Sequence, residues 1–232
     1  MLHKIKSDKP DEVHFYVGRK RCRFGRVEFD LVTGLNLLPG PIEKDIKEKG
    51  SSDRLIMEYF NGNPSISFGQ MRRVFESCIE VDDVYKLGMA LFVMGVLTGK
   101  EEKIVVPPFV IRMVDNLPFF YEYPWGKILY TKLMETCNKD YVDVKNKMLK
   151  KIKKGVTQKE SKYSSYGYTA ALQYWAYEVI VELGNEYAVK KSHRFPRMVS
   201  WESKPKTTLG KDEVIRLFAR NVSFLHFMFN SC

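Results

Sequence analysis

The chain has few of the residues from which metal centres and disulfide frameworks are built. Its 232 residues include only four cysteines, which lie far apart and form no C-x-x-C pair. That spacing excludes a zinc ribbon and the dense disulfide framework of a small secreted domain. The four histidines form no H-E-x-x-H motif, so a zinc site would need ligands from distant positions. We therefore expect no metal ion and no cofactor.

Long apolar runs are also missing. The N-terminus, MLHKIKSDKPDEVHF, contains no stretch that resembles a signal peptide. The longest apolar run, residues 84–98, includes Lys86 and is shorter than the roughly 20 residues that a membrane-spanning helix needs. These absences indicate a soluble, intracellular protein in a reducing compartment.

Catalytic motifs are absent as well. The segment from Gly95 to Lys100 has one residue too few between its glycines for a phosphate-binding loop, and no Ser or Thr follows the lysine. Cys78 and Cys137 lie at helical positions among apolar neighbours, where structural thiols far outnumber nucleophiles. A cysteine hydrolase remnant stays a remote alternative. We expect that the chain is not an enzyme.

What the chain does contain is enough apolar residues, 44%, to build a substantial core. Alternation on both sides of Gly18 predicts two short strands over residues 13–24. Helical spacing then predicts helices over residues 26–33, 53–60, 82–99, 126–137, 140–153, 169–183 and 211–229, with others beginning at Ser67 and Pro107. The predicted fold is mainly α (α+β): a single compact helical domain over residues 1–232 with a small N-terminal β-hairpin.

Local signals predict several helix ends. Gly34 and Gly184 follow helical segments and are expected to end them, because glycine adopts the left-handed conformation without strain. Ser67 and Gln70 have the spacing of a capping box at a helix N-terminus. The tryptophans, Trp175 among them, are expected to be structural.

Positive charge is abundant and unevenly distributed. The formal net charge is +10. Residues 19–26 carry net +5, residues 139–162 net +6 and residues 190–206 net +5, so the rest of the chain is net −6. A mildly acidic body with three basic segments favours a polyanionic partner, either nucleic acid or an anionic membrane surface. We expect the three segments to converge on one face.

Five motifs in a fixed order resemble a known family. They are FGRVEFDLVTGLN (24–36), VLTGKEE with the following VPP, YPWG (123–126), YSSYGYTAALQYWAYEVI (163–180) and PRMVSW (196–201). They resemble a plant domain of unknown function that is found in the VANC anti-silencing proteins of VANDAL transposons. The same domain lies upstream of Ulp-type SUMO protease-like domains in transposon proteins. The resemblance covers about residues 10–202, and the helix expected at about 211–229 is additional.

The resemblance implies a nuclear, non-enzymatic DNA-binding module. VANC-like proteins bind short DNA motifs repeated in their own element and cause loss of DNA methylation there. The family motifs themselves are expected to be structural, and the resemblance supplies no contact residues. Candidate contacts therefore rest on charge and residue type.

The first candidate contact surface is the hairpin with the residues after it. Its basic residues are Arg19, Lys20, Arg21, Arg23 and Arg26. A β-ribbon can lie on the phosphate backbone or enter a groove, and arginine is suited to bidentate contact with guanine. A solvated turn accounts for the same residues equally well.

The second candidate surface is a lysine-rich amphipathic helix and the polar linker that follows it. Its residues are Lys145, Lys147, Lys150, Lys151, Lys153, Lys154, Lys159, Lys162 and Tyr163. Lysines usually contact phosphates without discriminating between sequences. The alternatives are a solvated face, an acidic membrane or a partner groove for the helix, and core packing for Tyr163.

The third candidate surface is a basic loop. Its residues are Lys190, Lys191, His193, Arg194, Arg197, Lys204 and Lys206. Arg194 and Arg197 are the expected base or minor-groove contacts, because a loop arginine can reach a narrow, electronegative groove. A solvated loop is the alternative.

Together these observations predict a monomeric protein that binds double-stranded DNA through a short specific motif. Chromatin or methylation-control proteins are expected as further partners, with no membrane and no small-molecule substrate. Two alternatives stay open: a protein-interaction module that recruits chromatin factors, and a non-specific nucleic-acid binder.

Overall fold

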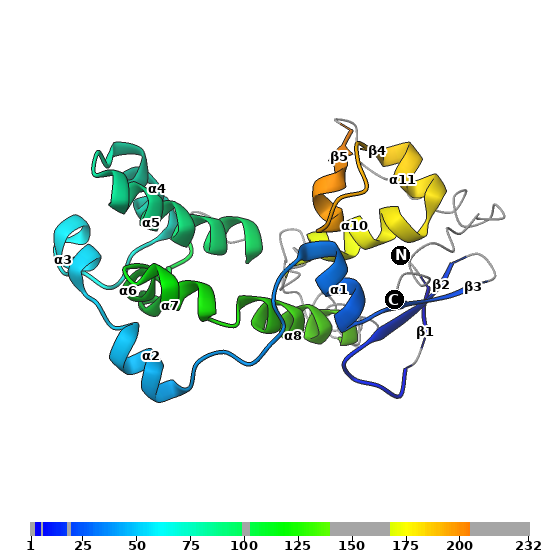
Figure 1. Cartoon of the computed structure of the whole chain (residues 1–232), viewed down its shortest axis with the longest axis horizontal. Coiled ribbons are helices and arrows are strands. Elements are labelled where there is room, and N and C mark those ends of the chain that lie inside the picture. Colours follow the sequence, from blue (N-terminus) through cyan, green and yellow to red (C-terminus); the bar gives the residue numbers. More distant parts are fainter. Residues whose placement is uncertain (1–2, 6, 18–19, 99–102, 140–167, 205–232) are drawn as a thin grey trace, which may run out of the picture. The chain divides into compact units, whose positions relative to one another are not determined.

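The computed structural model describes residues 3–5, 7–17, 20–98, 103–139 and 168–204, and the structural statements below concern these residues. The chain divides into two compact units. Unit 1 comprises residues 1–35 and 130–232, and unit 2 comprises residues 36–129 (Figure 1). No domain boundary is predicted from the sequence at either junction. That residues 1–232 act as one DNA-binding domain stays a prediction.

Unit 1 begins with a three-stranded antiparallel sheet. Its strands are β1 (His3–Ile5), β2 (Val13–Val17) and β3 (Lys20–Phe24), in the order β1-β2-β3. The predicted β2–β3 hairpin is confirmed, whereas β1 was not expected. An isolated hairpin is marginally stable, and this one packs on helix α10 (Ala170–Val179). The rings of Phe15 and Phe24 contact Trp175 there, at centroid distances of 5.6 and 5.4 Å.

Helix α1 (Arg26–Thr33) follows β3 with the bounds that the sequence predicted. Its first turn is closed by Glu28, whose carboxylate accepts a hydrogen bond of 2.8 Å from the backbone N–H of Gly25. Gly34 ends the helix in the left-handed region, with φ 67°, and its N–H donates to the carbonyl of Asp30. The buried ring of Phe29 meets Tyr130 edge-on at 5.3 Å.

The other described elements of unit 1 include the C-terminal part of α8 (Trp125–Asn138), a helix that begins in unit 2. The remainder are α10, α11 (Val181–Tyr187), β4 (Ala188–Lys190), the 3₁₀ helix η2 (Arg197–Ser200) and β5 (Trp201–Ser203). The antiparallel pair of β4 and β5 was not expected. Helices α1 and α10 pack together, and both contact β3 and η2 (Figure 1).

The single helix predicted over residues 169–183, with Gly184 as its terminator, is wrong. The helix breaks at Ile180, which has extended backbone angles, and α11 then continues through Gly184. Gly184 instead allows a close approach. A Cβ atom there would lie 2.7 Å from the carbonyl oxygen of Tyr177 and 2.8 Å from the ring of Trp201.

Unit 2 consists of short helices around a core that includes the fully buried side chains of Leu55, Met71, Leu87 and Ile111. Its elements are α2 (Glu43–Lys49), α3 (Arg54–Phe60), α4 (Phe68–Ser77), α5 (Val81–Leu91), the π-helix η1 (Phe92–Leu97), α6 (Pro108–Val114) and α7 (Leu117–Glu122), followed by the start of α8. Helix α5 packs against α4 and α6, and α6 packs against α3 and α7.

Most predicted elements of unit 2 are confirmed. The capping box of Ser67 and Gln70 begins α4. The helix predicted over residues 82–99 is two elements, because α5 passes into the π-helix at Phe92. The helix predicted to begin at Pro107 is followed by a second one, α7, which Asn116 caps by accepting a hydrogen bond from the N–H of Phe119.

The mainly α class with a small N-terminal hairpin is therefore confirmed. The helices predicted over residues 140–153 and 211–229 lie outside the described residues.

Candidate nucleic-acid interface

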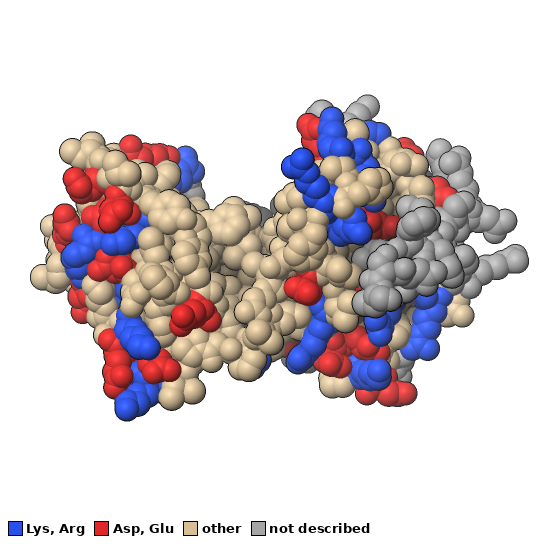
Figure 2. All heavy atoms as spheres, in the orientation of Figure 1, with Lys and Arg blue, Asp and Glu red and all other residues tan. Residues whose placement is uncertain are grey.

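Charge separates the two units. Unit 2 contains 11 Lys and Arg residues and 13 Asp and Glu residues, a net charge of −2, so unit 1 carries net +12. All three basic segments belong to unit 1. Figure 2 shows Lys and Arg side chains gathered over β4 and β5, whereas acidic and basic side chains alternate over the helices of unit 2. Unit 1 is therefore the part of the molecule that would attract a polyanion.

On the hairpin, Arg21 is held by a short chain of hydrogen bonds. Its Nε donates to Nδ1 of His14 at 2.9 Å, and Nε2 of the same ring lies 2.8 Å from Oε1 of Glu12. Since Nδ1 accepts, the ring proton belongs on Nε2 and is donated to Glu12. This hydrogen bond from His14 lowers the pKa of Glu12. The exposed guanidinium of Arg21 is thus oriented, although the ring that orients it is buried.

Arg23 has a structural partner. Its Nη2 lies 2.9 Å from Oε1 of Glu28, a carboxylate that is only 2% exposed. That hydrogen bond raises the pKa of Arg23, whose side chain is 43% exposed. The same carboxylate caps α1, so Arg23 neutralises a buried charge that the fold requires. Among the described residues, Arg26 has by contrast only a loose, exposed ion pair with Asp11 at 3.9 Å.

Lys190 is also committed to the fold. Its Nζ lies 3.0 Å from Oε1 of Glu178, which is 6% exposed, and 5.1 Å from the ring centroid of Trp201. The indole N–H of Trp201 donates to the same carboxylate at 2.6 Å. Glu178 therefore has both a cation and a donor, as a buried carboxylate needs.

The other basic residues of this region are less constrained. Lys191 forms an exposed ion pair of 2.9 Å with Glu202, and exposed pairs of this kind contribute little to stability. Lys204 donates to the carbonyl oxygen of Asn185 at 2.6 Å. Nη1 of Arg197 donates to the carbonyl oxygen of His193 at 2.9 Å, so Arg197 holds the loop on which Arg194 lies.

Arg194 is the loop arginine that is available to a ligand. Its side chain is exposed and forms no hydrogen bond or ion pair with any described residue, and the same holds for the side chain of His193. An arginine of this kind loses no intramolecular contact when it binds a phosphate or a base edge. Of the two loop arginines predicted to contact DNA, Arg197 is engaged within the fold and Arg194 is not. Arg194 is therefore the stronger candidate.

Several predicted contacts lie outside the part of the chain that the structure describes. The side chains of Arg19, Lys20 and Lys206, and all residues of the lysine helix and linker from Lys145 to Tyr163, lie outside the described residues. The described parts of the other two segments, β3 and the β4–η2–β5 region, are both next to α1 and α10. Convergence of all three segments on one face stays a prediction.

Unit 2 contains an ion-pair cluster that the sequence analysis missed. Arg54 donates to Asp83 at 2.5 Å and to Asp115 at 2.6 Å, and Lys86 also donates to Asp115 at 3.0 Å. The hydrogen bond from Arg54 lowers the pKa of Asp83. Burial alone would raise the pKa of Asp115, but hydrogen bonds from Arg54, Ser52 and Lys86 outweigh it and hold the pKa well below its usual range. These charges are neutralised internally.

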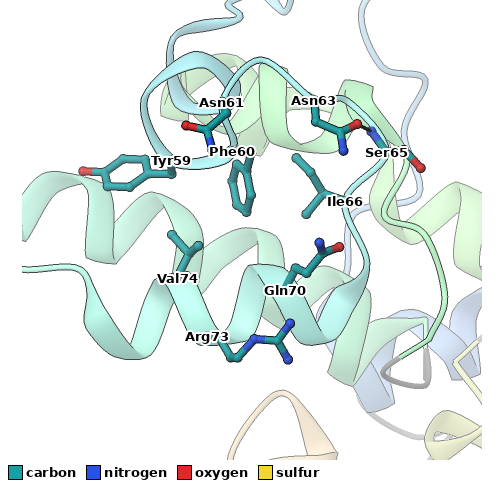
Figure 3. Close-up of a pocket in the computed structure, with 9 residues that line it drawn as sticks. All are labelled: Tyr59, Phe60, Asn61, Asn63, Ser65, Ile66, Gln70, Arg73 and Val74. Atoms are coloured by element: carbon teal, nitrogen blue, oxygen red, sulfur yellow. Dashed lines mark hydrogen bonds between the residues drawn. The ribbon is translucent and has the colours of Figure 1, made fainter.

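Unit 2 also has a hollow of about 390 Å³ between α3 and α4 (Figure 3). Its apolar lining includes Phe60, Ile66 and Val74, with Asn63, Gln70 and the exposed Arg73 among the polar residues. The amide oxygens of Asn63 and Gln70 accept backbone hydrogen bonds from Ser65 and Ser67. The lining contains one charged group and no acid–base pair, so it resembles neither a hydrolytic site nor a DNA-binding surface.

Other site classes find no support in the part of the chain that the structure describes. Within those ranges, no three His, Cys, Asp or Glu side chains come together as metal ligands would. None of the helices there combines the length and apolar character that crossing a bilayer requires.

Comparison with known proteins gives a family. The sequence profile of DUF1985, a domain of unknown function, matches residues 1–136. The chain belongs to the DUF1985 family. The match extends from β1 into α8 and includes all of unit 2, whereas the resemblance noted above was placed at about residues 10–202. No curated protein and no solved structure matches the chain.

The described structure adds residues of the candidate interface that were not predicted. Glu28 and Glu178 explain why two of the predicted DNA contacts are engaged within the fold. Phe195, which is 61% exposed next to Arg194, is a further candidate. The signal for Phe195 in the sequence was a large aromatic residue within a basic segment, which a count of charges does not detect.

Proposed function

We propose that this DUF1985 protein binds double-stranded DNA at a short specific motif and that unit 1 makes the contacts. The observation that carries the proposal is the charge separation, net +12 against net −2. Excess charge of one sign repels itself and opposes compact folding. A unit that retains such an excess is well suited to a polyanionic partner.

Within unit 1 the contacts divide into two kinds. Phosphate contacts, and with them most of the affinity, would come from the exposed Lys191 after β4 and from the lysines of the basic segment 139–162. Arg194, and Arg21 on the hairpin, would supply sequence discrimination, because arginine can donate two parallel hydrogen bonds to guanine or enter a narrow minor groove. Arg23 and Lys190 support these surfaces from within the fold.

The biological role that we propose follows from the resemblance to VANC proteins. Binding to motifs in its own transposon would direct loss of DNA methylation there and would occur in the nucleus. The protein would act as a non-enzymatic, monomeric adaptor, with chromatin or methylation-control proteins as further partners.

The test is selection of bound sequences from a random duplex pool at a salt concentration near the physiological value. We expect enrichment of one short motif, and a log–log salt dependence whose slope reflects several phosphate contacts. A bound but unenriched pool would leave non-specific nucleic-acid binding. An absence of duplex binding would favour the protein-interaction alternative, in which the positive charge of unit 1 attracts an acidic protein.

A further inference from the structure

The loop between β4 and η2 is short and firmly held. The backbone N–H of Lys191 donates to the carbonyl oxygen of Ser200 at 2.8 Å. The hydroxyl of Ser200, a completely buried residue, donates to the carbonyl oxygen of Arg194 at 3.1 Å and lies 2.9 Å from the hydroxyl of Ser192. Together with the hydrogen bond from Arg197 to the carbonyl of His193, these contacts fix the loop at several successive positions.

The fixed loop displays three consecutive side chains, His193, Arg194 and Phe195. All three are exposed, and no hydrogen bond, ion pair or ring contact joins their side chains to a described residue. Phe195 is 61% exposed. One edge of its ring lies beside the end of α1, since a Cβ at Gly34 would lie 3.1 Å from the Pro196 ring and 3.7 Å from Cε1 of Phe195. Figure 1 shows this segment beside α1.

A single exposed aromatic residue is common on protein surfaces. Here it is combined with a rigid backbone and with two neighbours, an arginine and a histidine, whose side chains have no described partner. A rigid loop loses little conformational entropy on binding. An apolar side chain next to a cationic arginine matches a base step, in which an apolar stack lies between two rows of phosphates.

We propose that Phe195 is a wedge that inserts between two base pairs from the minor groove, while Arg194 occupies the groove beside it. This inference rests on the proposed DNA binding and specifies its mode. Apolar wedges such as Phe or Leu partly unstack a base step and kink the duplex toward the major groove, by roughly 20–90°. Flexible pyrimidine–purine steps are the least costly to kink, so Phe195 would add specificity without a base hydrogen bond.

Duplex DNA fits this loop better than a single strand does. Single-strand binders stack successive bases on a series of aromatic side chains along a groove. The loop presents one aromatic residue, flanked by the two groups that would meet the backbone and the groove. The proposal therefore commits to a kinked duplex.

The experiment uses the full chain with a duplex taken from the selected pool, labelled at its two ends for energy transfer. A second set of duplexes carries 2-aminopurine, each at a different candidate step. With the wild-type protein we expect shortened end-to-end distance and increased 2-aminopurine fluorescence at one step. Phe195→Ala should abolish both signals and weaken binding by about tenfold, with an unchanged salt slope. Phe195→Leu keeps an apolar wedge and should restore most of the kink.

Two controls complete the design. Phe92→Ala removes a comparably exposed aromatic residue, 44% exposed, from unit 2 and should change neither signal. Thermal unfolding of Phe195→Ala should match that of the wild type, because the ring is not part of the core.

The outcomes separate the wedge from the proposed function. If the wild-type protein fails to bind any duplex, DNA binding itself is wrong. If it binds but leaves the duplex straight, or if Phe195→Ala bends DNA like the wild type, only the wedge is wrong. Tighter binding to single strands than to the duplex, or a marked loss of thermal stability in Phe195→Ala, would also overturn the wedge.

Discussion

The two units treat charge in opposite ways. In unit 2 the charges nearly balance, and its most buried carboxylates, Asp83 and Asp115, are neutralised by Arg54 and Lys86. In unit 1 the net charge is +12, and two of its basic residues, Arg23 and Lys190, pair with the buried carboxylates of Glu28 and Glu178. A basic residue in a basic segment is therefore not automatically a DNA contact. What distinguishes a candidate contact is a cation that the fold leaves without a carboxylate.

The largest expected effect tests whether DNA binding depends on where the lysines lie in the molecule or only on how many charges are removed. Replacing Lys150, Lys151, Lys153 and Lys154 with Gln should weaken binding to selected and scrambled duplexes alike, on the order of 100-fold, and flatten the log–log salt slope by about 3–4. The matched control removes four charges from unit 2, as Lys44, Lys47, Lys49 and Lys103→Gln, and should have far less effect. Binding isotherms over a salt series measure both, and equal losses for the two sets would erase the distinction between the units.

A stability experiment sharpens the distinction within unit 1. Lys190→Ala leaves the buried carboxylate of Glu178 without its cation and should lower the free energy of unfolding by about 2–4 kcal/mol. Lys191→Ala removes an equal charge from an exposed pair, in which the Lys191 side chain is 58% exposed, and should cost at most about 1 kcal/mol. Urea unfolding measures both variants. Equal destabilisation would mean that Lys190 has no special structural role.

The third prediction concerns the arginine that the fold leaves available. Arg194→Ala should cost about 1–3 kcal/mol on the selected duplex and much less on a scrambled one. Arg194→Lys should fail to restore the difference, because lysine lacks the bidentate geometry. Arg73→Ala, an exposed arginine of unit 2 that has no described side-chain partner, is the control and should leave both isotherms unchanged. An equal loss on both duplexes would reduce Arg194 to a positioning group.

The smallest expected effect is the acid sensitivity of unit 2, which shows only well below neutral pH. The pKa values of Asp83 and Asp115 are lowered in the folded state, so their contribution to stability is complete above the unfolded pKa, about 3.9. It is lost as the pH falls through the folded pKa values. The urea midpoint should therefore be constant from pH 7 to 5 and fall below pH 4. Asp115→Asn should begin lower and fall less steeply, and parallel curves would contradict this origin.

The sequence predicted local structure better than it predicted the tertiary contacts of individual residues. Gly34, the Ser67–Gln70 capping box and the hairpin around Gly18 depend on neighbouring residues, and all three predictions are confirmed. Gly184 also followed a helical pattern, but its role is set by Tyr177 and Trp201, which a local pattern does not include. The third strand, β1, and the β4–β5 pair are too short to give a clear alternation.

The candidate interface shows the same limit. Clustered charge identified the basic segments, and their assignment to one unit follows from the contacts of the fold. Charge counting could not separate Arg23 from Arg194, because the carboxylate that engages Arg23 lies on the buried side of α1. Nor could it identify Arg54, which meets Asp115 across 61 residues of sequence.

The central claim is that unit 1 contacts the DNA and unit 2 does not. Amide hydrogen exchange of the full chain, with and without a selected duplex, tests it most directly. We predict slower exchange in peptides that cover residues 13–24 and 188–203 of unit 1, with no change in peptides from α2 to α7, residues 43–122. Protection confined to the helices of unit 2, with the hairpin and the β4–η2–β5 region unchanged, would contradict the account.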